Sequence, residues 1–194
     1  MISSRKEYLN YLKADRIALG VIDWSIKQRI LYYLVPGLTL KFHRILRKCE
    51  YYKNCKKGYI NKLIYWYYFY QFRRISVRLG FSVPENIFGP GLAIVHYGTV
   101  VVHKNAKVGK NCRIQACTNI GASGGSDRAP VIGDNVYIGP GAKIYGDIKI
   151  ASNTAIAANA CVNRSVLSEG YLVGGVPAEL IKEIDITRII TCAR

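Results

Sequence analysis

Apolar residues recur at every sixth position between Val102 and Leu167. An α-helix would repeat its apolar face about every 3.6 residues, and a half-buried strand would repeat it at every second residue, so neither explains this spacing. Ser126, inside a Gly/Ser-rich stretch, occupies the one slot in this phase that is not apolar. The apolar residues in phase are Val102, Val108, Ile114, Ile120, Ile132, Ile138, Ile144, Ile150, Ile156 and Val162.

A six-residue period is typical of a parallel β-helix, in which each hexad forms one short strand and one turn. Three hexads complete one triangular coil, and the aliphatic residue of each hexad points inward, onto its counterpart one coil away. One coil cannot bury its own apolar face, so stability comes from stacked neighbours. The alternative, alternating strands of a sandwich, does not require a fixed phase over eleven hexads. We therefore predict a three-sided prism, with a flexible loop leaving one corner at residues 121–126.

The chain divides into three parts by pattern. Apolar spacings of three and four predict helices over residues 8–20, 24–33, 40–52 and 60–79, the last ended by Gly80. Pro84, Gly89, Pro90 and Gly91 mark the lead-in to the hexads. We expect a basic, aromatic-rich helical domain at residues 1–80 and a β-helix domain at residues 81–178. The tail, residues 179–194, is expected to be a short helix or irregular.

The net charge of +16 is concentrated in the first part of the chain. Residues 1–80 hold 17 Lys and Arg against 4 Asp and Glu, whereas residues 81–194 hold 11 against 8. Such a basic surface favours an anionic partner: the phosphates of a cofactor, a membrane face or nucleic acid.

The expected helix over residues 60–79 holds six consecutive aromatic residues at 65–70, followed by Arg73, Arg74 and Arg78. We expect these rings to pack on the prism and on neighbouring helices. Base stacking on single-stranded nucleic acid and an amphipathic helix on a membrane surface remain alternatives.

No apolar run reaches the roughly 20 residues that span a bilayer, and no signal peptide pattern is present at the start. The six cysteines lack the paired spacing of a zinc site. We expect a cytoplasmic protein with reduced thiols and no bound metal.

Three histidines are the candidates for a general base. His43 lies in a basic helical segment, where it is interpreted as a surface or packing residue. His103 lies beside Lys104 in a hexad turn. His96 lies between a strand and a Tyr-Gly turn at the start of the prism, and it is either a structural residue or a base whose near-neutral pKa suits proton removal from a hydroxyl.

Four local motifs accompany the hexads: GLAIVHYG at 91–98, SDRAP at 126–130, IGPGAKI at 138–144 and GVPA at 175–178. Together with the hexads they resemble the serine acetyltransferases and, more broadly, the hexapeptide-repeat acyltransferases. The resemblance covers about residues 84–182. The hexads alone imply the fold and acyl transfer, whereas the histidine, the loop and the final GVPA indicate the serine branch.

This resemblance implies a left-handed β-helix, an exception to the usual right-handed crossover. It implies a homotrimer, with acetyl-CoA bound in the groove between two neighbouring prisms. His96 aligns with the catalytic base, which would take the proton of the acceptor hydroxyl as the oxygen attacks the thioester. A covalent acyl-enzyme is not needed, because the interface brings both substrates together.

The resemblance also suggests binding residues. Gly121 and Ala122 at the loop, and Pro140 and Ala158 at hexad corners, would approach the pantetheine through their backbone, since small or rigid corners admit a ligand closely. Arg164 and Lys182 are chosen for the CoA phosphates on charge and position, and Arg128 is expected to bind an acceptor carboxylate.

The chain departs from the family pattern at three positions. Val95 replaces the Asp before the histidine, Ala129 replaces a second histidine in the loop, and Phe81 aligns with the acid that orients the base. Asp15 is the candidate for the acid that binds the serine ammonium. Glu85 or a backbone carbonyl is the candidate for orienting His96.

These departures leave the acceptor open between serine and a sugar hydroxyl. The main hypothesis is a CoA-dependent serine O-acetyltransferase, and the second is a sugar or polysaccharide O-acetyltransferase. A third hypothesis is a non-catalytic scaffold whose basic helices bind a membrane or nucleic acid, although nucleic acid is the less favoured partner.

Overall fold

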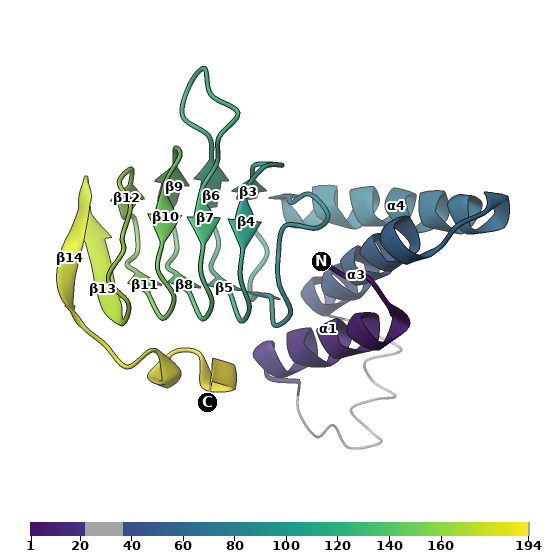
Figure 1. The fold of residues 1–194 in the computed structure, drawn as a ribbon, viewed down its shortest axis with the longest axis horizontal. Helices are drawn as coiled ribbons and strands as arrows, with labels where there is room; N and C mark the ends of the chain where they lie inside the picture. Colours follow the sequence, from purple (N-terminus) through teal and green to yellow (C-terminus); the bar gives the residue numbers. More distant parts are fainter. Residues whose placement is uncertain (22–36, 194) are drawn as a thin grey trace.

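The computed structural model describes residues 1–21 and 37–193, in which a three-sided prism of parallel strands carries helices at one end (Figure 1). The described helices are α1 (Arg5–Ala18), α3 (Leu38–Cys55) and α4 (Tyr59–Leu79). They correspond to the helices predicted over residues 8–20, 40–52 and 60–79. The helix predicted over residues 24–33 lies outside the described residues.

Local signals set the helix ends. The Ser4 hydroxyl accepts the backbone N–H of Glu7 (3.1 Å), and the Glu7 carboxylate accepts the backbone N–H of Ser3 (2.7 Å), so two free donors at the start of α1 are satisfied. At the other end of the helical part, α4 stops at Gly80, whose φ of +77° is the left-handed conformation of a C-terminal cap.

The prism has three sheets, which the chain visits in turn, so that each complete coil between β3 and β11 contributes one strand to each. Sheet A contains β1 (Phe81–Ser82), β3 (Val100–Val102), β6 (Thr118–Gly121), β9 (Lys143–Tyr145) and β12 (Cys161–Val162). Sheet B contains β4 (Lys107–Val108), β7 (Val131–Ile132) and β10 (Lys149–Ile150). Sheet C contains β2 (Ala93–Ile94), β5 (Arg113–Ile114), β8 (Tyr137–Ile138), β11 (Ala155–Ile156), β13 (Tyr171–Gly175) and β14 (Ala178–Glu183).

The hexad phase places one aliphatic side chain of each strand inside the prism. Ile94, Ile114, Ile138 and Ile156 are in register along sheet C, and each is 0% exposed. All ten in-phase residues predicted from the sequence are at most 6% exposed. Since each such burial contributes about 1.5–3 kcal/mol, the stacked interior holds the coils together. The prediction of stacked parallel coils behind N-terminal helices is confirmed.

Asparagines close the corner between sheets B and C. Asn111, Asn135 and Asn153 have φ between +53° and +58°, a region that Asn tolerates better than other side chains. The side-chain amides of Asn111 and Asn135 each donate to the Asn side-chain carbonyl of the next coil at 2.9 Å, and the amide of Asn153 donates to the Glu169 carboxylate at 3.3 Å. This ladder fixes the same turn in successive coils.

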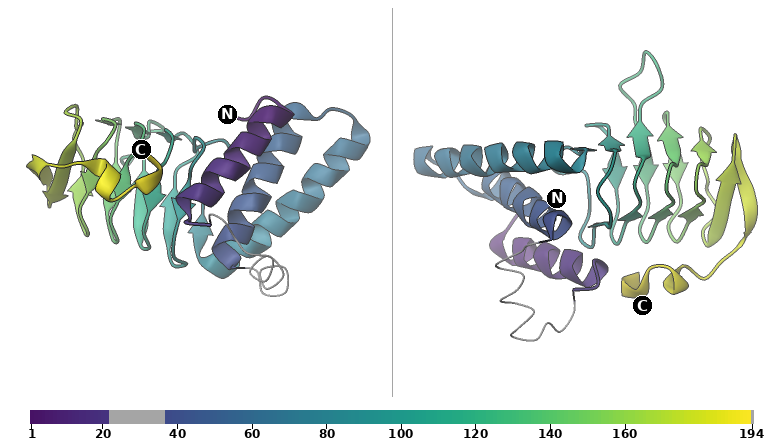
Figure 2. Two further views of the ribbon diagram at one scale, coloured as in Figure 1. Left: turned by 90° about the horizontal axis from the view of Figure 1, so that it is seen from below. Right: turned by 180° about the vertical axis from the view of Figure 1, so that it is seen from behind.

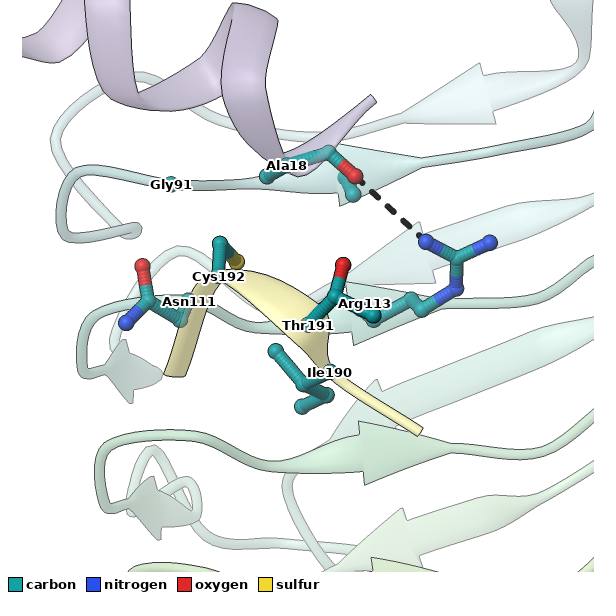
Figure 3. A pocket seen from close by; sticks show the side chains of 8 residues that line it. Ala18, Gly91, Asn111, Arg113, Ile190, Thr191 and Cys192 are labelled. Carbon is teal, nitrogen blue, oxygen red and sulfur yellow. Dashed lines mark hydrogen bonds between the residues drawn. The ribbon is translucent and has the colours of Figure 1, made fainter. Parts of the chain in front are cut away.

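The tail differs from its expected form. The segment after Pro177 forms the strand β14, which pairs antiparallel with β13 and covers the last coil. Two short 3-10 helices then return along sheet C towards α1 (Figures 1 and 2). Ile190 and Cys192 close a cavity of about 10 Å³, the size of one water, beside the contact between the Arg113 guanidinium and the Ala18 carbonyl (3.4 Å; Figure 3).

A continuous apolar core joins the helices to the prism, together with the buried ion pairs that Arg47 forms with Asp15 and Glu50. Phe42 and Leu46 of α3 and Phe72 of α4 lie in the same core as Leu92 and Ile94 of the first coil. His43 is also buried here: its Nδ1 lies 2.7 Å from the Thr39 carbonyl, and its Nε2 accepts the backbone N–H of Ile94 (3.2 Å). Burial lowers the pKa of His43, so this imidazole packs in neutral form. Of the two interpretations of His43, packing is confirmed.

Candidate active site

His96 stands at the corner between sheets C and A, two residues after β2. Its side chain is exposed, and within the described residues no group forms a hydrogen bond with its ring. The following residue, Tyr97, is 74% exposed. The imidazole is therefore accessible to a substrate from solvent.

Register places three small corner residues in line with His96 along the prism. Ile94, Ile114, Ile138 and Ile156 are paired strand to strand, so the residues two positions later occupy equivalent corners. The equivalent residues are His96, Ala116, Pro140 and Ala158, which we call the His96 column. Neighbouring coils lie about 4.8 Å apart, so the column follows a straight path of several coils. Its small side chains leave room for an extended ligand that ends at the imidazole.

A second group of predicted residues gathers at the corner between sheets A and B, which we call the loop corner. Gly121 ends β6 and Ala122 follows it, and the segment up to Pro130 protrudes from the prism (Figure 1). Arg128 lies in this loop, and its guanidinium pairs with the Asp147 carboxylate at 2.8 Å, both side chains being exposed. Arg164 is exposed at the same corner after β12.

One chain does not bring the two groups together. The His96 column precedes the strands of sheet A, and the loop corner follows them. Three-residue strands such as β3 and β9 separate the two corners by about 10 Å or more. Lys182 belongs to neither corner, because it is exposed on β14 at the end of the prism that is remote from the helices.

The expectation that Asp15 binds the acceptor is wrong. Its carboxylate is buried, and one oxygen accepts the backbone N–H groups of Gly91 and Leu92 at 2.9 Å each. The other oxygen pairs with Arg47 Nε at 2.8 Å. These hydrogen bonds and the ion pair hold the lead-in segment of the prism. Because they engage both carboxylate oxygens, neither oxygen is accessible to a substrate ammonium.

Arg47 is the centre of this cluster, and its role was not predicted from the sequence. It is 0% exposed, pairs with Glu50 at 2.9 Å, and donates to the carbonyls of Phe88 (3.0 Å) and Gly89 (2.8 Å). Burial alone would lower the pKa of Arg47, but the Asp15 and Glu50 carboxylates raise it overall. The cluster fixes the segment from Phe88 to Leu92, and its contact with Gly91 lies five residues before His96.

Within one chain Glu85 does not lie beside His96, so the structure gives no support to the expectation that Glu85 orients this residue. Glu85 lies on the loop-corner side of the prism, where its carboxylate accepts from Lys53 Nζ (2.7 Å) and the Tyr65 hydroxyl (3.2 Å). Desolvation, reinforced by this carboxylate, raises the pKa of Tyr65. These residues lie beside a cleft of about 370 Å³ between α4 and the prism, which is also lined by Arg73 and Lys104.

Phe81, the residue aligned with the missing acid, is buried and packs edge-on against Phe42 at 5.0 Å. An aromatic core residue thus occupies the place of a polar orienting group.

His103 is the residue that sequence reasoning placed only as a turn residue. It precedes Gly121 by three hexads and so stands one coil below it at the loop corner, where its backbone N–H donates to the Ile120 carbonyl (2.7 Å). The Asn105 side chain, two residues on, donates to the Asp127 carbonyl of the loop (2.8 Å). Counting hexads along the sequence would have located His103 at this corner.

A model of the family described as bacterial transferase hexapeptide (six repeats) matches residues 129–164. A serine acetyltransferase from Mycobacterium tuberculosis is 39% identical over 100 residues, which are 50% of this chain and 43% of that protein. The chain thus spans less than half the length of that relative.

Solved structures extend the similarity to the helices. The serine acetyltransferase of Brucella abortus in complex with coenzyme A has a TM-score of 0.71 and 27% identity, covering 93% of this chain and 70% of that one. The Neisseria gonorrhoeae serine acetyltransferase in complex with serine has a TM-score of 0.67 and 26% identity, covering 92% and 71%. The repeat model and these structures imply a left-handed β-helix. The resemblance predicted from the sequence is confirmed: the chain carries a bacterial transferase hexapeptide repeat and is similar to the serine acetyltransferases.

Proposed function

We propose that this chain is an acetyl-CoA-dependent O-acetyltransferase, with residues 81–178 as its catalytic domain and residues 1–80 as a helical domain. The similarity to serine acetyltransferases supports the activity. The observation that carries the site is the accessible His96 at the end of a column of small corner residues, Ala116, Pro140 and Ala158. Within the described residues no cluster of His, Cys, Asp or Glu could hold a metal ion, and none is needed for the proposed reaction.

In this proposal His96 acts as the general base. The imidazole removes the proton of the acceptor hydroxyl while its oxygen attacks the thioester carbonyl of acetyl-CoA. The carbon–sulfur bond then breaks, and the protonated imidazole returns its proton to the leaving thiolate. His43 is buried in neutral form, and His103 lies in a turn at the loop corner, where its Nδ1 accepts the backbone N–H of Asn105. His96 is therefore the histidine that we propose as the base.

The fit of acetyl-CoA rests on the two corners. The pantetheine arm would lie along the His96 column, where Pro140 and Ala158 are exposed and small or rigid. Gly121 and Ala122 would contact it from the loop corner. Because the two corners lie on opposite sides of sheet A, we propose a homotrimer in which the loop corner of one chain faces the His96 column of its neighbour. Arg164 and Lys182, both exposed, are the proposed contacts of the CoA phosphates.

Serine is the first candidate acceptor, because the similar proteins are serine acetyltransferases and one was solved with serine. Arg128 would bind its carboxylate by exchanging its exposed pairing with Asp147.

A sugar hydroxyl is the second candidate, and the position of Asp15 favours it. The acid expected to bind the ammonium is buried against Arg47, and the loop carries Ala129, which is itself buried, where the family has a histidine. A sugar has no ammonium group and does not require that acid.

The experiment is an acceptor screen with the purified chain and acetyl-CoA, following free thiol and identifying the acetylated product by mass spectrometry. Acceptors are L-serine, neutral hexoses and N-acetylhexosamines, with an acceptor-free reaction to measure hydrolysis. Release with L-serine supports the first candidate, and release with sugars alone supports the second. Thiol release no faster than hydrolysis with every acceptor would contradict an acetyltransferase of either kind.

Arg128→Gln sharpens the choice. If serine is the acceptor, the variant raises KM for L-serine and leaves KM for acetyl-CoA unchanged. A neutral sugar offers no carboxylate to Arg128, so its KM should not change. Lys107→Gln, which removes an equal charge from the outer face of β4, is the matched control.

A further inference from the structure

The helix α4 is apolar on two opposite faces. Its inner face buries Phe72, Ile75 and Leu79 against α3 and the first coils. Its outer face exposes seven large apolar or aromatic side chains, from 52% exposed at Leu63 to 77% at Tyr59 and Val77. We call these residues the outer stripe: Tyr59, Ile60, Leu63, Trp66, Tyr67, Tyr70 and Val77.

The outer stripe follows one side of the helix. Tyr59, Leu63, Trp66, Tyr70 and Val77 are separated by three, four or seven positions, the spacing of neighbours on one helix face. The aromatic run expected to pack on the prism is therefore divided. Tyr65, Tyr68 and Phe69 pack against the core, whereas Trp66, Tyr67 and Tyr70 do not.

Positive charge borders the outer stripe. On the helical wheel, Lys62 and Arg73 lie along one border of the stripe, and Arg78 lies beside Ile60 at the other border. Arg74 lies within the stripe, between Leu63 and Tyr67, and all four basic side chains are exposed. α4 contains no Asp or Glu. The Arg74 guanidinium stays close to the stripe, 5.7 Å from the centre of the Tyr70 ring.

α4 also extends away from the prism, beyond the end of α3, in both side views of the molecule (Figures 1 and 2). Among the described helices none is long and apolar enough to cross a bilayer, so any lipid contact of these helices would be peripheral. A helix of this kind, with Trp, Tyr and Leu on one face and Lys or Arg at its borders, suits the plane of a membrane interface.

We propose that α4 binds the surface of an anionic lipid bilayer, with the outer stripe at the boundary between headgroups and acyl chains. Lys62, Arg73, Arg74 and Arg78 contact lipid phosphates, which supply the negative charge that this part of the chain lacks. A second copy of the chain fits the stripe less well, because pairing two such helices would bring their basic borders together. A polynucleotide would leave Ile60, Leu63 and Val77 without apolar partners.

The test is vesicle flotation of the purified full chain. Vesicles of phosphatidylcholine alone are compared with vesicles that also contain phosphatidylglycerol, at low and high salt. We expect flotation only with phosphatidylglycerol, weakened by salt. Arg73→Gln combined with Arg74→Gln should lower the partition coefficient roughly thirtyfold, since each basic residue near an anionic surface contributes a few-fold to tenfold. Trp66→Ser combined with Tyr70→Ser should lower it by at least about tenfold.

Matched controls separate a surface effect from misfolding. Lys107→Gln combined with Lys110→Gln removes the same charge from the prism, and Leu180→Ser removes an exposed apolar side chain from β14. Both should float like the parent, and circular dichroism should show native helix content in every variant.

Three outcomes would overturn the proposal. The first is no flotation with anionic vesicles, and the second is flotation that the α4 variants do not weaken. The third is a change in sedimentation mass or polynucleotide affinity on α4 substitution while vesicle binding stays unchanged. Because none of these measurements involves acetyl-CoA, failure here leaves the proposed acetyltransferase activity untouched, and the reverse also holds.

Discussion

The helix–prism junction and the His96 column use ionisable side chains in opposite ways. At the junction Asp15, Arg47 and His43 are at most 1% exposed, and their polar atoms are satisfied by one another or by backbone groups. At the column His96 is exposed and forms no hydrogen bond with any described residue.

The difference shows that residue type alone does not assign a role. Two histidines from one chain differ in what surrounds them: His43 is held neutral between Thr39 and Ile94, whereas the side chain of His96 is exposed to solvent. The junction stabilises the segment that carries His96, so one region maintains the geometry that the other requires.

Replacing His96 should give the largest effect. His96→Ala should lower the rate of acetyl transfer by about 10²–10⁴-fold, the usual contribution of a positioned general base. The melting temperature should stay that of the parent, because the side chain is exposed. His103→Asn is the comparison variant and should change the rate less than tenfold. A rate loss as large as that of His96→Ala would contradict the assignment of the base to His96, because His103 lies at the loop corner.

Replacing Asp15 should affect stability instead. Asp15→Asn leaves the Arg47 charge with one fewer carboxylate, and breaking a buried pair costs about 3–5 kcal/mol. Urea unfolding followed by circular dichroism measures this loss. KM for the acceptor, taken at a temperature where the variant is folded, should not change. An unchanged midpoint together with a raised KM for serine would restore Asp15 as an acceptor-binding residue.

The neutral burial of His43 predicts a pH dependence of stability. Because burial lowers the pKa of His43 in the fold, the unfolded chain binds the proton more readily, and stability is lost as pH falls below the unfolded pKa of about 6.5. The loss amounts to at most about 1.4 kcal/mol per pH unit.

His43→Gln keeps a donor and an acceptor but does not titrate. Unfolding free energies of both proteins between pH 7 and about pH 5 should diverge, with the parent losing more. Parallel curves would show that the pKa of His43 is not lowered in the fold.

Blocking the His96 column with a large side chain should have the smallest effect on stability and should affect binding of acetyl-CoA specifically. Ala158→Trp adds a large ring at an exposed corner, so the melting temperature should change little. KM for acetyl-CoA should rise about tenfold or more if the pantetheine lies along the column, while Lys149→Trp, at an exposed position on sheet B, should not change it. Equal effects of the two variants would contradict the proposed path of the ligand.

The predictions that succeeded rest on the six-residue repeat of apolar residues. Because inward residues repeat every six positions, the sequence alone predicts the buried aliphatic residues from Val102 to Val162. The alignment of His96 with Pro140 and Ala158 comes from the structure, because Ile94 pairs with Ile114, which is two residues further along the chain than three hexads would place it. Counting the same phase also locates His103 next to the loop corner.

The predictions that failed involve contacts between distant segments. Asp15 meets Arg47 and Gly91 only because α1, α3 and the lead-in segment pack together, and no local spacing reports that meeting. Likewise, β14 forms because the last coil offers an open edge to the residues that follow it. The exposure of Trp66 depends on how far α4 extends past α3, which its apolar composition does not reveal.

The proposed catalytic site is shared between two chains. Co-expressing His96→Ala chains with chains carrying Ala122→Trp at the loop corner tests this directly, with each variant also purified alone. Each parent should be nearly inactive, and the mixed assembly should regain a clear fraction of native acetyl transfer, because some interfaces would then pair an intact His96 with an intact loop corner. Mixed assemblies no more active than their parents, with mixing verified by affinity tags, would contradict a shared site.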